Sequence, residues 1–424
     1  MSKCYSHLYI HLSYKCIYFF TRSKHLSFFF NINVKKSKKS DLLCNINLRM
    51  FHININLYCM YLKYFEPISN NTKALIENLL EHQIGKNIDC FNSTFPYIED
   101  KDLVLIGIGE TSELFRLQFY KLSHNFKNIR IADLGNLKPN CSKYLNDIIE
   151  HCLSKNTLPI IISNSDKLLN FLPEHTNNNI SNIIVVDKDI SLSLEKEVDK
   201  TNLSYSSLLL NKKIKLFNFG LIGYQSYYIN SKIIGFFDKQ NYDYLRLGTL
   251  KKHLELSEPL IRDADFMGFN LAALKKIEVP SCSTASPSGL FVEEACQLTY
   301  YAGISDKMRF CNIYGYDVFD INENQTPQAI SQMVWYFIYG YYNRKHDYPV
   351  SMNNFIEFIV NFKTSNYQVT FWKSTKSDRW WMEVPVKEKT KIRHRLIPCS
   401  YNDYLEAGNG NLPERLLNAH QRFE

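Results

Sequence analysis

Short apolar runs alternate with amphipathic segments between residues 102 and 187, and this alternation limits the possible folds more than any other feature. Apolar runs typical of buried strands lie at 102–109, 129–133, 158–163 and 182–187. Segments with the apolar spacing of helices follow the first three runs, at 112–125, 143–154 and 166–172. A repeated strand–helix order predicts a mainly parallel sheet with helices on both faces. We therefore expect a three-layer α/β/α fold.

A further strand–helix–strand unit is expected between Asp263 and Gly315. It combines a buried strand at 264–269, a polar loop, a helix that begins near Ser288 and Gly289, and a second buried strand at 308–314. The loop follows the carboxyl end of a strand, where an open parallel sheet binds its ligands. This loop is therefore the first place to look for a functional site.

The remaining segments complete the same architecture. Their pattern predicts a helix at 68–84 capped by Ser69 or Asn70, a strand at 214–219, a helix near 224–232, a strand at 243–247, a helix at 248–256, a long helix at 325–345 and, in the tail, two strands and two short helices. The long helix should face inward through Ile330, Met333, Val334 and Phe337. No linker divides residues 60–424, so we expect a single domain there.

Residues 1–59 differ from the rest of the chain in their charge. They hold nine of the 50 Lys and Arg residues and one of the 42 acidic residues, so the remainder of the chain is neutral. A neutral body makes nucleic acid an unexpected partner, and no apolar run reaches the roughly 18 residues of a membrane span. We expect 1–59 to be disordered or an upstream extension, with Met1, Met50 and Met60 all open as the true start.

Cysteines and histidines offer no metal-binding pattern. The eleven cysteines are spread singly, without a CxxC pair, and the eight histidines after residue 60 form no HxH or HxxxH pair. Single cysteines in apolar segments, such as Cys296 and Cys311, are typical of reduced core residues. We therefore predict a cytoplasmic protein.

Several ordered motifs in the second half of the chain resemble the ureohydrolase family of arginase, agmatinase and formimidoylglutamase. They are ASPSGL at 285–290, EEACQL at 293–298, YAGISDK at 301–307 and PCSYNDYLEA at 398–407. The chain is most similar to the formimidoylglutamase-like branch found in Bacteroidetes. The resemblance implies an arginase-like fold and a water bridged by two Mn²⁺ ions, which attacks a guanidino or formimino C–N bond.

The family's six metal ligands are mostly absent at the matching positions of this sequence. The resemblance places them in a turn that ends at Asp166, in a DxHxD motif matched by residues 187–191 and in a DxD motif matched by residues 270–272. A later glutamate of the family is matched by residue 315. Asp187 is retained, Asp189 replaces a histidine, and Ser191, Asn270, Ala272 and Gly315 replace carboxylates. Thr284 is a further pocket position by resemblance. Acidic residues at strand ends, such as Asp187 and Asp189, also occur as solvated or helix-capping side chains.

Three functional interpretations follow from this degenerate ligand set. The leading one is a catalytically impaired family member, or pseudoenzyme. The second is an active hydrolase that holds a single cation on Asp166, Asp187 and Asp189, which would require the three carboxylates to share one coordination sphere. The third is a subunit of a homo-oligomer that binds a guanidino or amino-acid ligand or serves a structural role, with a pocket near Asn270 and Thr284.

Two further groups of residues have a structural interpretation. Ser283, Ser286 and Ser288 are not surrounded by a GxSxG motif, and we interpret them as caps of the helix that follows. Trp380 and Trp381 could form a wall against a ligand, but strand pairing that seals the domain, or an oligomer contact, explains them better.

Overall fold

The computed structural model describes residues 61–109, 111–164, 181–190, 192, 205, 208–209, 216–317, 323–362, 368–385 and 395–423. The chain divides between residues 57 and 58, and the fold described below belongs to the second part. The division of the chain at residues 59 and 60 stays a prediction. Within the described residues, no helix is both long enough and apolar enough to cross a membrane.

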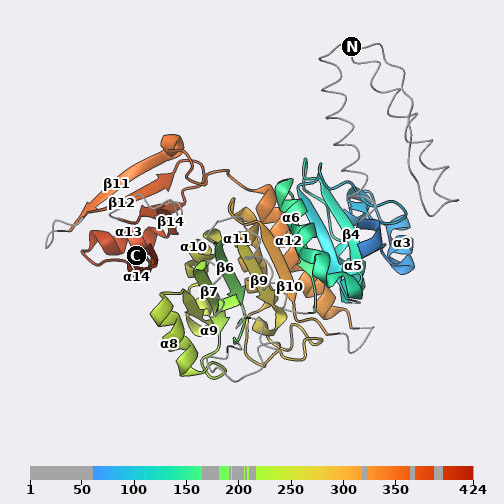
Figure 1. The fold of residues 1–424 in the computed structure, drawn as a ribbon, viewed down its shortest axis with the longest axis horizontal. Coiled ribbons are helices and arrows are strands. Elements are labelled where there is room, and N and C mark those ends of the chain that lie inside the picture. The colour runs from blue at the N-terminus through green and yellow to red at the C-terminus, as the bar shows by residue number, and fades with distance from the viewer. Residues whose placement is uncertain are drawn as a thin grey trace, which may run out of the picture. The chain divides into compact units, whose positions relative to one another are not determined.

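A large, mainly parallel sheet forms the centre of the fold (Figure 1). Across the sheet its strands follow the order β1 (Phe65–Glu66), β4 (Ile131–Leu137), β3 (Leu103–Ile108), β5 (Leu158–Ile162), β10 (Phe310–Tyr314), β9 (Phe266–Asn270), β6 (Ser181–Val186), β7 (Leu216–Tyr224) and β8 (Tyr244–Arg246), and β2 (Asp89–Cys90) also pairs with β4. Only β1 runs antiparallel to its neighbour among these described strands. The predicted parallel sheet is confirmed.

Helices cover both faces of this sheet. Successive residues of β3 point to opposite faces, and Leu103, Val104, Leu105 and Ile106 are all buried. The helices are α3 (Asn70–Glu77), α4 (Ile84–Asn87), α5 (Thr111–Phe119), α6 (Leu145–Ser154), α8 (Ser231–Gln240), α9 (Leu247–Lys252), α10 (Ser257–Arg262), α11 (Val292–Ile304) and α12 (Gln325–Tyr342). The inward residues predicted for α12, Ile330, Met333, Val334 and Phe337, are fully buried.

Several predicted helices begin or end elsewhere, among them those expected at 112–125 and 248–256, which end at Phe119 and Lys252. The helix expected at 68–84 has the predicted cap, Ser69, but ends at Glu77, where the Asn78 side chain donates to the Ala74 carbonyl. The helix expected near 224–232 is wrong. Strand β7 continues to Tyr224 because its residues are buried on both faces, and α8 begins only after Asn230, whose side chain accepts from the Lys232 N–H.

The predicted serine caps of α11 are also wrong. The helix begins at Val292, and the Glu294 carboxylate accepts the Phe291 N–H at 2.8 Å. The residues before it form bends and isolated bridges, and Gly289 packs against the backbone after η6 (Leu271–Ala273), where an added Cβ would lie 2.4 Å from the Leu274 carbonyl carbon. Ser286 instead donates to the Ser288 carbonyl oxygen at 2.6 Å. The predicted helix at 166–172 lies outside the described residues.

A second, antiparallel sheet follows α12. Its strand order is β11 (Phe355–Asn361), β12 (Gln368–Ser374), β13 (Trp380–Glu383) and β14 (Leu396–Cys399), and the two predicted short helices follow as α13 (Tyr401–Gly408) and α14 (Glu414–Phe423). Trp380 and Trp381 are buried in β13, where Trp381 pairs with Trp372 of β12. The strand pairing of these buried tryptophans is confirmed, and an oligomer contact stays a prediction.

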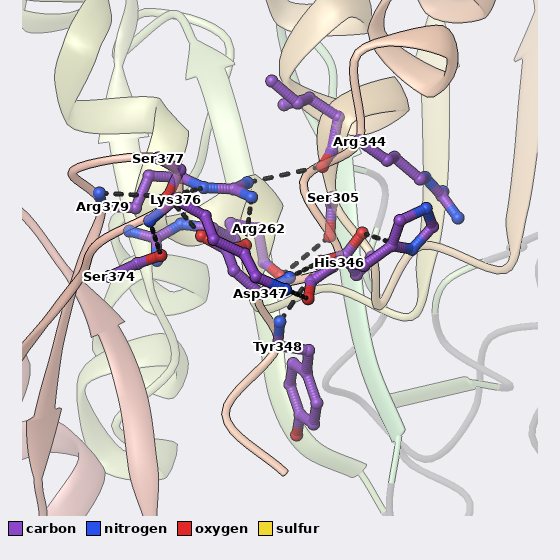
Figure 2. Close-up of polar contacts among 12 residues, drawn as sticks. Arg262, Ser305, Arg344, His346, Asp347, Tyr348, Ser374, Lys376, Ser377 and Arg379 are labelled. Carbon is purple, nitrogen blue, oxygen red and sulfur yellow. Dashed lines mark hydrogen bonds and ion pairs between the residues drawn. The ribbon is translucent and has the colours of Figure 1, made fainter. Parts of the chain in front are cut away.

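Two arginines, Arg262 and Arg379, connect the second sheet to helices that cover the parallel sheet, and Figure 2 shows the surroundings of Arg379. Arg262, at the end of α10, donates to the Trp380 and Cys399 carbonyl oxygens at 3.1 and 3.0 Å, and its guanidinium stacks 4.3 Å from the Trp381 ring centre. Arg379, before β13, pairs with the buried carboxylate of Asp347. Stacked, multidentate guanidinium groups hold a fixed geometry, so the second sheet is firmly attached.

Candidate functional site

The residues matched to the family's ligands follow neighbouring strands of the large sheet. Strands β5, β10, β9 and β6 lie side by side and are parallel, so their carboxyl ends meet at one edge. Ser163 follows β5, Gly315 follows β10, Asn270 ends β9 and Asp187 follows β6. These four positions therefore lie at the same edge of the sheet.

Asp187 is the only carboxylate of the matched DxD and DxHxD positions that lies buried, with 3% of its surface exposed. Its Oδ2 accepts a hydrogen bond from Asn270 Nδ2 at 2.8 Å, and its Oδ1 accepts the Lys188 N–H at 2.7 Å. Burial raises the pKa of Asp187 to about 7, although the bond from Asn270 opposes this shift. Both oxygens of this carboxylate thus already have protein donors.

Asp189 is paired with its neighbour rather than with Asp187. Lys188 Nζ lies 3.5 Å from Asp189 Oδ2 and 4.2 Å from the centre of the Tyr228 ring. A lysine ammonium within this distance offsets the negative charge that a divalent cation would need. Lys188 therefore competes with any metal ion for Asp189.

Asn270 contacts Asp187 on one side and lies close to Gly315 on the other. Asn270 Oδ1 accepts the Ala272 N–H at 3.0 Å, while its amide nitrogen faces Asp187. Gly315 has a φ of +90°, and an added Cβ would lie 2.4 Å from Asn270 Oδ1. The backbone at 315 therefore suits glycine, and Ala272 offers no side-chain oxygen.

The other predicted site residues have different surroundings. Thr284 Oγ1 lies 3.6 Å from Cys282 Sγ, and Ser163 Oγ donates to Asn312 Oδ1 at 3.0 Å. Asp166 and Ser191 lie outside the described residues, so the trio of Asp166, Asp187 and Asp189 stays a prediction. In the part of the chain that the structure describes, no three His, Cys, Asp or Glu side chains gather as a metal site.

Gln225, which the sequence analysis did not identify, connects three loops at the same edge. Its backbone N–H donates to the Lys188 carbonyl at 2.7 Å, and its Nε2 donates to the Ser288 carbonyl at 2.9 Å. Its Oε1 accepts from Tyr227 at 2.5 Å. A polar residue directly after a buried apolar run is a usable signal, but the mistaken helix at 224–232 concealed it.

The described residues do not fit a pair of manganese ions. Such a pair needs several carboxylate or imidazole ligands with free lone pairs. At this edge the oxygens of Asp187 already accept N–H groups, and Asp189 lies beside Lys188. Positions 270, 272 and 315 hold an amide, an alanine and a glycine. Its chemistry suits hydrogen bonding between loops.

Asn270→Asp should destabilise the metal-free protein by about 2 kcal/mol near pH 8, because it replaces the N–H donor of Asp187 with a second carboxylate. The loss should shrink as pH falls through the Asp187 pKa of about 7.

The stability of the native protein should also depend on pH through Asp187. Because its pKa in the folded protein lies above that of the unfolded chain, Asp187 contributes most stability below about pH 4, and this contribution fades as pH rises through 7.

Urea unfolding at several pH values measures these effects. The double variant Asp187→Asn with Asn270→Asp is the matched control, since it restores one carboxylate and one amide and should recover most of the loss. An Asn270→Asp protein as stable as the native one at pH 8 would contradict the described hydrogen bond.

Comparison with known proteins identifies the fold. No protein-family model matches the chain, and no curated protein sequence matches it. Among solved structures, a Trypanosoma cruzi formiminoglutamase with Mn²⁺ aligns over 62% of this chain and 99% of its own, with 16% identity and a TM-score of 0.52. The formimidoylglutamase of Bacillus subtilis aligns over 62% of this chain and 92% of its own, with 14% identity and a TM-score of 0.53. The chain therefore has the arginase-like fold of these two enzymes, with helices around a large and mainly parallel sheet.

Proposed function

We propose that this protein is a formimidoylglutamase-like member of the arginase family that has lost binuclear manganese hydrolysis. The shared fold with two enzymes of that name supports the family, together with the motifs between residues 285 and 407. The observation that carries the loss of hydrolysis is the 2.8 Å hydrogen bond from Asn270 to Asp187. An amide N–H occupies the carboxylate oxygen that would otherwise face a metal ion.

The chemistry of hydrolysis explains why this bond matters. Two divalent ions are needed to lower the pKa of a bridging water, so that hydroxide forms near neutral pH and attacks the amidine carbon. Asn270 donates where a bridging carboxylate would accept a metal bond. Ala272 and Gly315 contribute no side-chain oxygen, and Lys188 repels a cation from Asp189.

We infer that the protein acts as a binding or structural subunit instead. A guanidino or amino-acid ligand belongs to the class that the family's enzymes hydrolyse, and Asp187 is the acidic group at the shared edge. Two cavities, of about 480 Å³ at residues 124–130 and about 340 Å³ around Asp306, Tyr348 and Phe355, lie away from Asn270 and Thr284.

The cysteines support a reducing compartment for this function. Seven described cysteines are free, among them the buried Cys152, Cys296 and Cys311. Burial raises the pKa of the Cys296 and Cys311 thiols to about 12, which keeps them protonated and unreactive. We propose the cytoplasm as the location of the protein.

The proposal predicts less than stoichiometric manganese and no hydrolysis. The full chain, incubated with Mn²⁺ and separated from free metal, is assayed for metal by elemental analysis. The same protein is assayed for glutamate release from N-formiminoglutamate and for urea release from arginine and agmatine. The Trypanosoma cruzi enzyme serves as the positive control for loading and turnover.

The alternative of a reduced carboxylate site makes the opposite prediction. An active enzyme would retain close to one Mn²⁺ per chain and release product, and Asp187→Ala would abolish both. That combination would overturn the proposed loss of hydrolysis and assign Asp187 as a metal ligand.

A further inference from the structure

Strand β11 forms the outer edge of the second sheet (Figure 1). It pairs with β12 over all seven residues, from Phe355 with Ser374 to Asn361 with Gln368, without a bulge. Among the described residues no strand pairs with its other side. Within that part of the chain, the backbone N–H and C=O groups on this side of β11 have no strand partner and can pair with another strand.

The composition of β11 is unusual for an exposed edge. Monomeric proteins protect sheet edges with lysine, proline, bulges or short strands. The sequence FIEFIVN has none of these and a single charge, Glu357. Ile356 and Ile359, on opposite faces of the strand, are 49% and 51% exposed. Both faces of this edge thus present apolar surface.

The sequence of β11 is complementary to itself in one antiparallel register. Only a two-fold axis at Phe358 pairs all seven residues, and it places Phe358 opposite Phe358 and Ile356 opposite Val360. Glu357 then lies opposite Ile359 of the second copy, so no like charges meet. Paired aromatic and β-branched residues are favourable partners across strands.

The edge is also held in place before any partner binds. Phe358 packs against Trp380 and Tyr404, with ring centres 4.9 and 5.6 Å apart, and Phe355 packs against Trp381. Trp381 in turn stacks on Arg262 of the parallel sheet's helix α10. Association of such an ordered strand loses little conformational entropy.

We propose that β11 is the interface of a homodimer, in which two copies pair their β11 strands about a two-fold axis at Phe358. The partner is a second copy of this chain because the strand is self-complementary and closed two-fold pairing satisfies both edges at once. The two four-stranded sheets then become one continuous sheet. This inference does not rest on the proposed loss of hydrolysis.

Two opposite charges at residue 359 test the register. Ile359→Glu places a carboxylate opposite Glu357 of the second copy, so the dimer dissociation constant should rise roughly tenfold or more. Ile359→Lys places an ammonium opposite the same Glu357, so this variant should remain dimeric. Sedimentation equilibrium of the full chain over a concentration series measures both, and circular dichroism confirms that the variants are folded.

Ile277→Glu is the matched control, because Ile277 is 73% exposed and lies outside the second sheet. It should leave the dimer unchanged. A native chain that is monomeric at every concentration would overturn the proposal, and so would an Ile359→Glu protein that dimerises normally. If the Ile359→Lys protein dissociates as much as the Ile359→Glu protein, the pairing about Phe358 is wrong. If β11 instead pairs with a strand of another protein, the native chain will be monomeric.

Discussion

Replacing Asp133 with asparagine should lower the free energy of unfolding by about 3 kcal/mol, because the buried Arg116 guanidinium loses its bidentate carboxylate and keeps only the partly exposed Glu113 as a counter-charge. Arg116 and Asp133 are almost completely buried, and two parallel bonds join them, from Nε to Oδ2 at 2.8 Å and from Nη2 to Oδ1 at 2.9 Å. The same carboxylate accepts from Tyr120 and from the Gly135 N–H, each at 2.9 Å. Urea unfolding followed by circular dichroism measures the loss.

The ion pair of Arg130 and Asp102 is the matched control. Its guanidinium Nε lies 3.5 Å from Asp102 Oδ2, and the two side chains are 58% and 30% exposed. Solvent screens such a pair, so Arg130→Gln should change the free energy of unfolding by less than about 0.5 kcal/mol. Equal effects at Asp133 and Arg130 would contradict the idea that burial makes the first pair indispensable.

Gly303→Ala should lower the free energy of unfolding by about 3 kcal/mol, through overpacking between α11 and α12. An added Cβ at Gly303 would lie 2.0 Å from the Phe337 carbonyl oxygen. The two helices approach this closely because α12 also has a glycine at the crossing, Gly340, whose added Cβ would lie 2.4 Å from the Tyr300 carbonyl oxygen. Backbone atoms cannot move aside as a side chain can, so one of the helices must shift.

Gly235→Ala should have the opposite effect and stabilise the protein. Gly235 lies inside α8, and an added Cβ would meet nothing within 4 Å. Alanine there should raise the free energy of unfolding by about 0.5–1 kcal/mol, since glycine has greater backbone freedom in the unfolded chain. Thermal or urea unfolding of both variants gives the comparison, and a stable Gly303→Ala protein would show that α11 and α12 are not in close contact.

The large sheet could be predicted because burial on both faces leaves a strong signal in short strands. Strands β3, β5 and β6 hold uninterrupted apolar residues over 103–106, 160–162 and 183–186, which is typical of short strands buried on both faces. Helix ends were harder to predict because they depend on single side chains. Asn78 and Asn230 each end or begin a helix through one hydrogen bond.

The site could be predicted in its position but only partly in its contacts. The order of strands and loops placed Asp187 and Asn270 near the same edge, and the resemblance to a family identified both residues. The direction in which the Asn270 amide points depends on the backbone of Ala272 and on the absence of a side chain at Gly315. Such contacts between distant segments leave no periodic pattern in a sequence.

Strand β11 was missed for a related reason. Its residues, FIEFIVN, are exposed to different degrees without the alternation that marks a half-buried strand. The attachment of the second sheet through Arg262 and Arg379 was also invisible, because each arginine contacts residues far away in the sequence, such as Trp380 and Asp347.

The bond between Asn270 and Asp187 has a consequence for any attempt to build a metal site at this edge. Aspartate introduced at residue 270 alone would first give a less stable protein, because two carboxylates would face each other with no cation between them. A carboxylate added at residue 272 alone gives no metal site either, and an added Cβ at residue 315 would lie 2.4 Å from Asn270 Oδ1. Several substitutions would therefore have to be introduced together, since each single one costs stability before a bound ion can offset the loss.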